Sequence, residues 1–391
     1  MLPLAAALVA CTPTSSVSPA HAPAMNLASP DARAAATTVD AFAADLHAAL
    51  PKSGNLFYSP ASIAIALGIA DQGAAGSTKA EMDKVLHLSG PVAYASLESA
   101  LASSASPEIG IADRLYFERS LAIDPAFAAL APNETVDFKN DSDGARKKID
   151  AWVSDRTHAK IPELIGPGVL TGDARFVIVN AVYFKGEWAQ RFDAGATRDD
   201  VFHADVDENA PTMHATLSAG YGAHGGAHVL DLPYKSAHGP ELSMTIVLPD
   251  ARAGLADVEA TYEKEGIAPF VAATSETEDV EVSIPKMKMT SSLELGDALK
   301  AMGMRKAFED DAELGGITRT EPVKISKVIH QAFAVVNEEG TEAAAATGVV
   351  GVKATAVMMQ TEFRADHPFL FFVRDRASGL VLFAGRCAKP V

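Results

Sequence analysis

Three glycines have a spacing that dinucleotide-binding loops use. Gly220, Gly222 and Gly225 satisfy the GxGxxG pattern, whose glycines let the backbone approach a pyrophosphate at the start of a helix. That chemistry needs an apolar strand before the glycines and a helix with a downstream acid after them, and neither is evident here. The pattern therefore predicts a flexible glycine-rich loop rather than a nucleotide site.

Four histidines crowd the same region of the chain. His214, His224, His228 and His238 lack a fixed ligand spacing and an accompanying cysteine, so they indicate solvated loop residues rather than a metal site. The chain also has neither a GxSxG elbow nor an HExxH motif, the usual signatures of serine hydrolases and zinc proteases. We expect no catalytic residues, no metal and no organic cofactor, and we predict that the protein is not an enzyme.

Polar residues inside apolar runs are more informative. Asn180 lies within VIVNAVYF, His330 lies within KVIHQAF, and Ser59 and Ser62 begin an apolar helix whose first turn contains Pro60. A buried amide, imidazole or hydroxyl that finds no partner costs roughly 1 to 3 kcal/mol. Taken alone, the pattern indicates unrelated polar groups in the core, each of which finds its own hydrogen-bond partner.

The longest segment without a core pattern runs from Glu338 to Arg364. It lies between two apolar, strand-like runs, and a segment of that length is usually disordered or functional. From Thr341 to Thr347 every side chain except Glu342 is small, so this part could enter a sheet as a strand without clashes. Composition alone favours a flexible linker.

The elements that must position these residues follow from periodicity. Apolar residues at helical spacing predict helices at 40–50, 60–69, 145–158 and 294–302. Apolar or alternating runs predict strands at 109–117, 176–184, 242–248, 280–289, 328–336, 368–373 and 380–386, the last two as a hairpin. Helices gather early and strands late without βαβ alternation, which predicts an α+β fold.

Several motifs resemble those of the serpin family. VVNEEGTEAAAAT and the later FRADHPFLFFVRD are similar to the two ends of the serpin reactive-centre loop, and further signatures follow serpin order: NLFYSPASIAIAL, GAAGST, VNAVYFKGEW, LPY and IPKMKM. The resemblance covers roughly residues 40–390. It implies the serpin fold, with helices packed on a large central sheet, two further sheets and an exposed reactive-centre loop at 338–364.

The resemblance also implies roles for the buried polar residues. Ser59, Ser62, Asn180 and His330 would meet behind the main sheet, as a cluster that gates the separation of its central strands. Trp188 would lie at the opening of that sheet, where the loop first enters.

The implied activity is suicide inhibition of serine, and also cysteine, endopeptidases. Cleavage would free the front half of the loop to enter the sheet, carrying an acyl-enzyme with it. The hinge would comprise Glu338, Glu339, Gly340, Thr341, Glu342, Ala343, Ala344, Ala345 and Ala346. It contains neither proline nor an inward-facing charge, which favours an inhibitor over the alternative, a non-inhibitory serpin acting as a surface binding protein.

The reactive bond follows from the family's usual spacing. Counting forward from the hinge predicts Ala354-Thr355, which suits an elastase-like or subtilisin-like protease. Counting backward gives a bond near Val357, and cleavage after Lys353 by a trypsin-like protease also stays open. The region 88–106, where some relatives carry a basic heparin-binding helix, has no Lys or Arg, so we expect no heparin site. We expect a monomer.

The chain begins with a short apolar run, MLPLAAALVAC, that resembles the lipobox of a bacterial lipoprotein. Residues 1–11 would be a signal peptide with Cys11 as the lipidated residue, 12–38 a disordered tether rich in Ser, Pro and Ala, and 39–391 a single serpin domain. This predicts a secreted protein anchored by lipid to the bacterial outer membrane or cell surface, with a periplasmic or extracellular location as the alternative.

Composition limits the partners. The 33 basic and 50 acidic residues give a net charge of -17, which opposes binding to phosphate backbones and anionic membranes. We therefore expect no nucleic-acid partner, and contact with a membrane only through the lipid. Apart from Cys11 the only cysteine is Cys387, which we expect to pack as a small buried apolar group.

Overall fold

The structure, a computed structural model, describes residues 24–90, 92, 94–102, 107–236, 239–341 and 361–390. The helices are α1 (Pro30–Ala49), α2 (Pro60–Asp71), α3 (Gly76–Val85), α4 (Tyr94–Ala102), α5 (Pro125–Ala128), α6 (Ser142–Arg156), α7 (Leu255–Glu265), α8 (Ala268–Ala272) and α9 (Gly296–Met302). The strands are β1 (Leu56–Tyr58), β2 (Glu108–Glu118), β3 (Asn133–Val136), β4 (Phe176–Glu187), β5 (Arg198–His203), β6 (Asp207–His224), β7 (Ala227–Pro233), β8 (Leu242–Pro249), β9 (Ser275–Pro285), β10 (Met287–Glu294), β11 (Lys327–Asn337), β12 (Gly340–Thr341), β13 (Glu362–Arg364), β14 (Phe369–Asp375) and β15 (Val381–Cys387).

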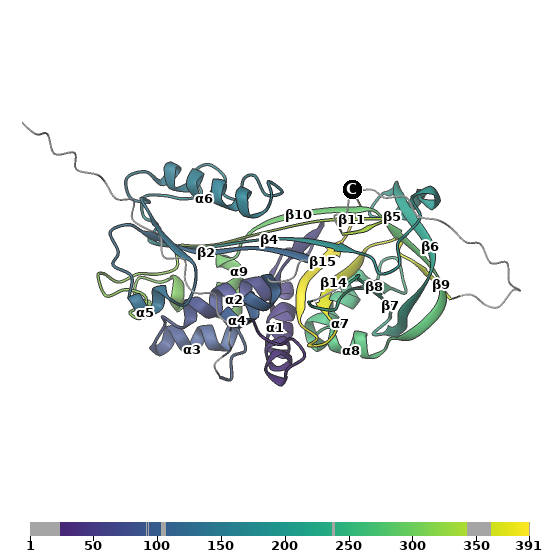
Figure 1. Ribbon diagram of the computed structural model, residues 1–391, viewed down its shortest axis with the longest axis horizontal. Helices are drawn as coiled ribbons and strands as arrows, with labels where there is room; N and C mark the ends of the chain where they lie inside the picture. Colours follow the sequence, from purple (N-terminus) through teal and green to yellow (C-terminus); the bar gives the residue numbers. More distant parts are fainter. Residues whose placement is uncertain are drawn as a thin grey trace, which may run out of the picture.

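The main sheet has the order β10-β11-β12-β4-β2-β3, and β11 also pairs directly with β4. Figure 1 shows α6 on one face of this sheet and α1, α2 and α4 on the other. Because both faces are covered, β4 is apolar along nearly its whole length. Ile149 and Val153 of α6 pack with Val177 and Val179 of β4 on the α6 face. The mixture of layered helices and mainly antiparallel strands confirms the α+β prediction.

The remaining strands form one nine-stranded sheet, in the order β1-β15-β14-β8-β7-β6-β9-β13 with β5 paired to β6. We expected two further sheets. They are joined here because β6 is long: residues 212–221 pair with β9, while residues 220–224 pair with β7. The irregularity between Leu217 and Ala219 bends the strand between its two groups of neighbours.

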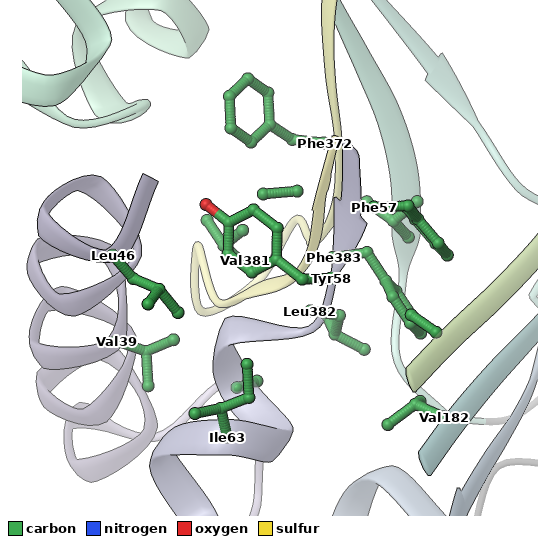
Figure 2. Close-up of a cluster of buried hydrophobic side chains, with 14 of the residues drawn as sticks. Val39, Leu46, Phe57, Tyr58, Ile63, Val182, Phe372, Val381, Leu382 and Phe383 are labelled. Carbon is green, nitrogen blue, oxygen red and sulfur yellow. The ribbon is translucent and has the colours of Figure 1, made fainter. Parts of the chain in front are cut away.

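One apolar core joins α1, α2 and strands of both sheets (Figure 2), and a second apolar cluster lies between α6 and the main sheet. Val39 and Leu46 of α1 and Ile63 of α2 lie close to Tyr58 of β1 and Leu382 of β15 in this view. Phe57 stacks on Phe383, with ring centroids 5.2 Å apart. Cys387 is fully buried in the same core, which confirms the expectation that it packs as an apolar group.

The helix at the start of the domain begins earlier than predicted. Residues 30–38, assigned to the tether, form the first half of α1, with Ser29 accepting from the backbone N–H of Ala32 and Pro30 in the first turn. Alanine has the highest helix propensity, and Ala32, Ala35 and Ala36 are buried. Because alanine side chains are small, they give only a weak amphipathic pattern, and the prediction of where the helix starts depended on that pattern.

The predicted loop 338–364 is also anchored at both ends. Gly340 and Thr341 already form β12, and 362–364 form β13, which runs parallel to β9. The prediction of a flexible glycine-rich loop is also wrong, because Gly220 and Gly222 lie within β6 and pair with Asp231 and Val229 of β7. A Cβ on Gly222 would lie 2.1 Å from the carbonyl oxygen of Ala273, so close packing explains that glycine.

The histidines are separate rather than clustered. His214, His224 and His228 lie on β6 and β7 rather than in loops and contact three different carboxylates, Asp200, Glu265 and Asp250, while His238 is outside the described residues. Within the part of the chain that the structure describes, no group of three or more His, Cys, Asp or Glu is placed to hold a metal.

Candidate functional site

The centre of the main sheet is a seam between two parallel strands. Val177–Tyr183 of β4 pair with Lys327–Phe333 of β11. Beyond those residues the strands are separated by β12, whose Gly340 pairs with Glu187 and whose Thr341 pairs with Gly186 and Val336. The chain therefore leaves β11, reverses, and starts an antiparallel strand between β11 and β4. Extending that strand requires breaking the β4–β11 ladder.

The reversal depends on Gly340. Its φ is +149°, in a region that side chains rarely adopt, and a Cβ there would lie 1.9 Å from the carbonyl oxygen of Gly186. Thr341 is 1% exposed, and its hydroxyl is 2.8 Å from that of Tyr234. Gly340 thus bends the chain, and Thr341 is the next residue and lies within the sheet.

Glu338 closes the top of the seam. Its carboxylate accepts from Lys286 Nζ at 2.9 and 3.0 Å and from the Thr197 hydroxyl at 2.8 Å. Although partial burial opposes ionisation, these bonds to Lys286 and Thr197 lower the pKa of Glu338 below its usual value. The carboxylate is therefore charged at neutral pH. It attaches the turn before β12 to Lys286, between β9 and β10, and to Thr197, directly before β5.

Trp188 lies beside the same turn. Its indole N–H donates to the carbonyl oxygen of Asn337 at 2.9 Å, and its backbone N–H donates to that of Glu339 at 2.9 Å. Its ring stacks on Tyr234 with centroids 4.6 Å apart. Trp188 therefore lies beside the upper end of the seam.

A single hydrogen-bonded network halfway along the seam contains Ser59, Ser62, Asn180 and His330. Asn180 of β4 is paired with His330 of β11, and both are at most 1% exposed. The Ser59 backbone N–H donates to His330 Nε2 at 3.1 Å, so the ring proton is on Nδ1, which donates to Asn180 Oδ1. The Asn180 amide donates in turn to the Ser62 hydroxyl. Complete burial lowers the pKa of His330 to about 3, so the imidazole is neutral.

This network connects the seam to α2. Ser59 caps α2 by accepting from the backbone N–H of Ser62 at 3.2 Å, and its hydroxyl donates to the carbonyl oxygen of Leu382 at 2.6 Å. The His330–Asn180 bond is the link that joins the two strands of the seam through their side chains. A strand that enters between β4 and β11 must break it.

Sequence reasoning missed other members of the site. Asp113 of β2 accepts from Ser62 and Asn180, yet its local sequence, IADRLYF, gives no sign of a buried acid. Lys286 and Thr197 contact Glu338 across 52 and 141 residues of sequence, which no local pattern encodes. Tyr234 could have been predicted as a member of the site, since it belongs to the LPY motif.

The other predicted residues lie outside the described part of the chain. They are the distal hinge residues Glu342, Ala343, Ala344, Ala345 and Ala346, the reactive-bond candidates Lys353, Ala354, Thr355 and Val357, and Cys11. Figure 1 shows β5, β6 and β9 gathered at one end of the molecule, and β13, where the loop returns, pairs with β9 there.

Fold and seam together define a protein whose main sheet carries the beginning of an additional strand, β12, between β11 and β4. A sequence model of the serpin family, described as serine protease inhibitors, matches residues 37–390. The chain belongs to the serpin family.

Similar proteins agree with this assignment. The chain is 37% identical over 371 residues to a leukocyte elastase inhibitor of Bos taurus, with 89% of this chain and 97% of the relative covered. It is 37% identical over 353 residues to Serpin B8 of Bos taurus, covering 86% and 93%. The crystal structure of Serpin48 from the insect Tenebrio molitor matches with a TM-score of 0.81 and 29% identity, covering 93% of this chain and 100% of that one.

The comparisons confirm some of the sequence predictions and give no support to others. The serpin fold and the family are confirmed. We predicted that the chain is not an enzyme, and the family model describes its members as inhibitors of serine proteases, which are themselves enzymes. The relatives named are animal proteins, so they give no support to a bacterial lipoprotein-type member. In the described residues, no helix is long and apolar enough to cross a membrane.

Proposed function

We propose that this chain is a suicide-substrate inhibitor of serine endopeptidases that traps the acyl-enzyme by inserting its cleaved loop into the main sheet. The observation that carries the proposal is the position of Thr341, already buried between β4 and β11 while the seam below it is closed by direct pairing. An entering strand would gain main-chain bonds on both sides, as in other strand-addition complexes.

Insertion must outrun hydrolysis. A protease serine attacks the reactive bond and forms an acyl-enzyme, after which the front half of the loop is free to continue β12 downward. A strand of about fourteen residues at about 3.3 Å each extends about 45 Å, so the bound protease is carried far along the sheet. Distortion of its active site before water attacks leaves the complex covalent.

We propose Ala354-Thr355 as the reactive bond, with Lys353 and Val357 as the alternative positions. A small residue before the bond suits elastase-like and subtilisin-like proteases first, whereas cleavage after Lys353 suits trypsin-like proteases. The support comes from the spacing to the hinge and from relatives named as leukocyte elastase inhibitors. Cysteine proteases are a further candidate class because they form the same kind of acyl intermediate.

The test is to incubate the protein with elastase, subtilisin and trypsin and to separate the products on a denaturing gel. A covalent adduct of protein and protease is expected, and mass spectrometry of the released peptide identifies the bond. The variant Thr341→Arg should become a substrate that is cleaved without forming the adduct, because an arginine cannot occupy that buried position. Thr37→Arg, on the exposed side of α1, is the matched control and should inhibit normally.

Two results would contradict the proposal. Cleavage of the unaltered protein by all three proteases without any adduct would favour the non-inhibitory surface binding protein. An adduct that Thr341→Arg forms as well as the unaltered protein would show that trapping does not use insertion at this seam.

We also propose that Cys11 is lipidated and that the part of the predicted tether (12–38) that precedes α1 connects the domain to a bacterial outer membrane or cell surface. The support is the apolar run before Cys11 and the Ser-, Pro- and Ala-rich segment after it. Metabolic labelling with a radioactive fatty acid should mark the protein, and Cys11→Ala should abolish the label. Equal labelling of the variant would contradict lipidation, and recovery of unlabelled protein in the medium would favour the periplasmic or extracellular location.

A further inference from the structure

A buried carboxyl extends the gate network on the side away from the seam. Asp113 of β2 pairs with Asn180 of β4, which pairs with His330 of β11. Directly paired residues point to the same face of a sheet, so the three polar side chains form a row across three strands. Asp113 is 8% exposed and lies at the end of the row.

The bonds of Asp113 fix the orientation of the Asn180 amide. Ser62 donates its hydroxyl to the two carboxyl oxygens of Asp113 at 3.1 and 2.9 Å, and Asn180 Nδ2 donates to Oδ1. With its NH₂ group facing two acceptors, Asn180 must turn its carbonyl oxygen towards β11. That oxygen then accepts from His330 Nδ1, so the bond across the seam depends on an acceptor at position 113.

The surroundings of the carboxyl favour its protonated form. Burial, followed by the charge of Glu98 on α4, raises the pKa of Asp113 well above its usual value, while the bonds from Ser62 and Asn180 only partly oppose this. Glu98 is itself partly buried, and burial raises its pKa to about 7. The groups that face Asp113 are thus Ser62 from α2, Glu98 from α4 and Asn180 from β4, with the neutral His330 beyond.

We propose that Asp113 is a positioning residue of the gate: it orients Asn180 for the bond to His330, and it couples separation of β4 and β11 to release of a proton. Separation of the strands admits water, which stabilises the carboxylate that the closed gate disfavours. The proton is released from the Asp113 carboxyl to solvent, and no bond between heavy atoms changes. This inference rests on the proposed function, since loop insertion is the event that uses the gate.

The direction of the pH dependence follows from the linkage between proton binding and gate opening. The closed gate binds the proton more tightly than the open gate, so opening becomes easier as pH rises from the ordinary aspartate pKa, about 3.9, to the raised one. One proton gives up to about a tenfold change in the opening equilibrium per pH unit within that window. Above the raised pKa the dependence ends, because both forms are ionised.

The experiment measures opening without a protease. A synthetic peptide with the sequence of residues 341–352 is added to the intact protein, and its entry into the seam is followed by the fluorescence of Trp188, with Trp152→Phe as the background variant. As the pH rises from about 4, near the ordinary aspartate pKa, the entry rate of the unaltered protein should increase several-fold and then level off. Asp113→Asn keeps an acceptor for Asn180 but cannot ionise, so its rate should be flat with pH.

Three further variants separate orientation from charge. Asp113→Ala removes the acceptor, so entry should be faster at every pH. Glu98→Gln should keep the rise but move it to lower pH, because one nearby negative charge is gone. Asp71→Asn, at a buried acid of α2 that contacts Lys79 rather than the sheet, is the control and should behave like the unaltered protein.

The outcomes are distinguishable from failure of the proposed function. If Asp113→Asn keeps the full pH dependence, or Glu98→Gln abolishes it, the proton does not belong to Asp113 and the inference is wrong. If Asp113→Ala admits the peptide no faster than Asp113→Asn, the residue does not position Asn180. Absence of any protease adduct with normal peptide entry would contradict the inhibitory function and leave the role of Asp113 standing.

Discussion

The contact between Glu338 and Lys286 gives the sharpest prediction. It attaches the turn before β12 to the segment between β9 and β10, so its loss should release β12 from the top of the seam. The Glu338 side chain is 12% exposed and that of Lys286 38%. The pair therefore lies between exposed ion pairs, which contribute about 0.2 to 1 kcal/mol, and buried pairs, whose disruption costs about 3 to 5 kcal/mol.

We expect a coupling free energy of about 1 to 2 kcal/mol between the two side chains. Glu338→Gln and Lys286→Met, singly and together, form a double-mutant cycle in which hydrogen exchange of the backbone amides of residues 336–341 reports opening. Each single variant should exchange roughly 5- to 30-fold faster, and the double variant should exchange little faster than either. Asp297→Asn, which removes an exposed pair with Lys300, should leave these amides unchanged.

A coupling below about 0.3 kcal/mol, the level at which independent sites simply add, would refute the reasoning. It would mean that the backbone bonds of Trp188 and Phe192 to the turn hold β12 without help from the ion pair.

Three further predictions concern stability and reactivity. Because burial lowers the pKa of His330 to about 3, the folded state disfavours its protonation, so His330→Gln should remove about 2 kcal/mol of the stability lost between pH 7 and pH 5; urea titrations at both pH values measure this, and equal losses would contradict it. Gly340→Ala should release β12 and abolish protease trapping, since its Cβ would meet the carbonyl oxygen of Gly186; a normal adduct would show that the turn relaxes. Burial raises the pKa of the Cys387 thiol, so a thiol reagent should modify it in urea but not in buffer.

The sequence singled out Asn180 and His330 because they break a strong pattern. Asn180 and His330 interrupt runs of apolar residues, and a buried polar group needs a partner. Periodicity placed the strands around them within a few residues, and the structure confirms the hairpin of β14 and β15. The meeting of Ser59, Ser62, Asn180 and His330 came from resemblance, since the contacts that join α2, β4 and β11 span 118 to 271 residues of sequence.

The missed features share a physical reason. Asp113 lies in a strand whose buried and half-buried residues follow no strict alternation, so its place in the sequence gives no sign that the acid is buried. The first half of α1 was missed because alanines bury little area and leave a weak period. The continuous second sheet depends on the length and bend of β6, which strand propensity does not specify.

The position of the gate along the seam determines when it acts. The closed part of the seam extends from Lys327 to Phe333, and His330 is the middle residue of that stretch. A strand growing downward from Thr341 must first separate the pairs at Phe333, Ala332 and Gln331, each of which is replaced by bonds to the entering strand on both sides. Those early steps favour entry, since each hydrogen bond contributes about 0.5 to 1.5 kcal/mol net.

The step at His330 differs, because a side-chain bond is lost there together with the backbone pairing. The imidazole N–H and the Asn180 carbonyl oxygen are left in a buried site, and leaving such groups unpaired costs about 1 to 3 kcal/mol each. The barrier to insertion should therefore lie at the middle of the seam rather than at its top. Weakening the Glu338 contact should speed fraying of β12 without speeding complete insertion as much as Asn180→Ala does, and a comparison of amide exchange with peptide entry for the two variants distinguishes the two steps.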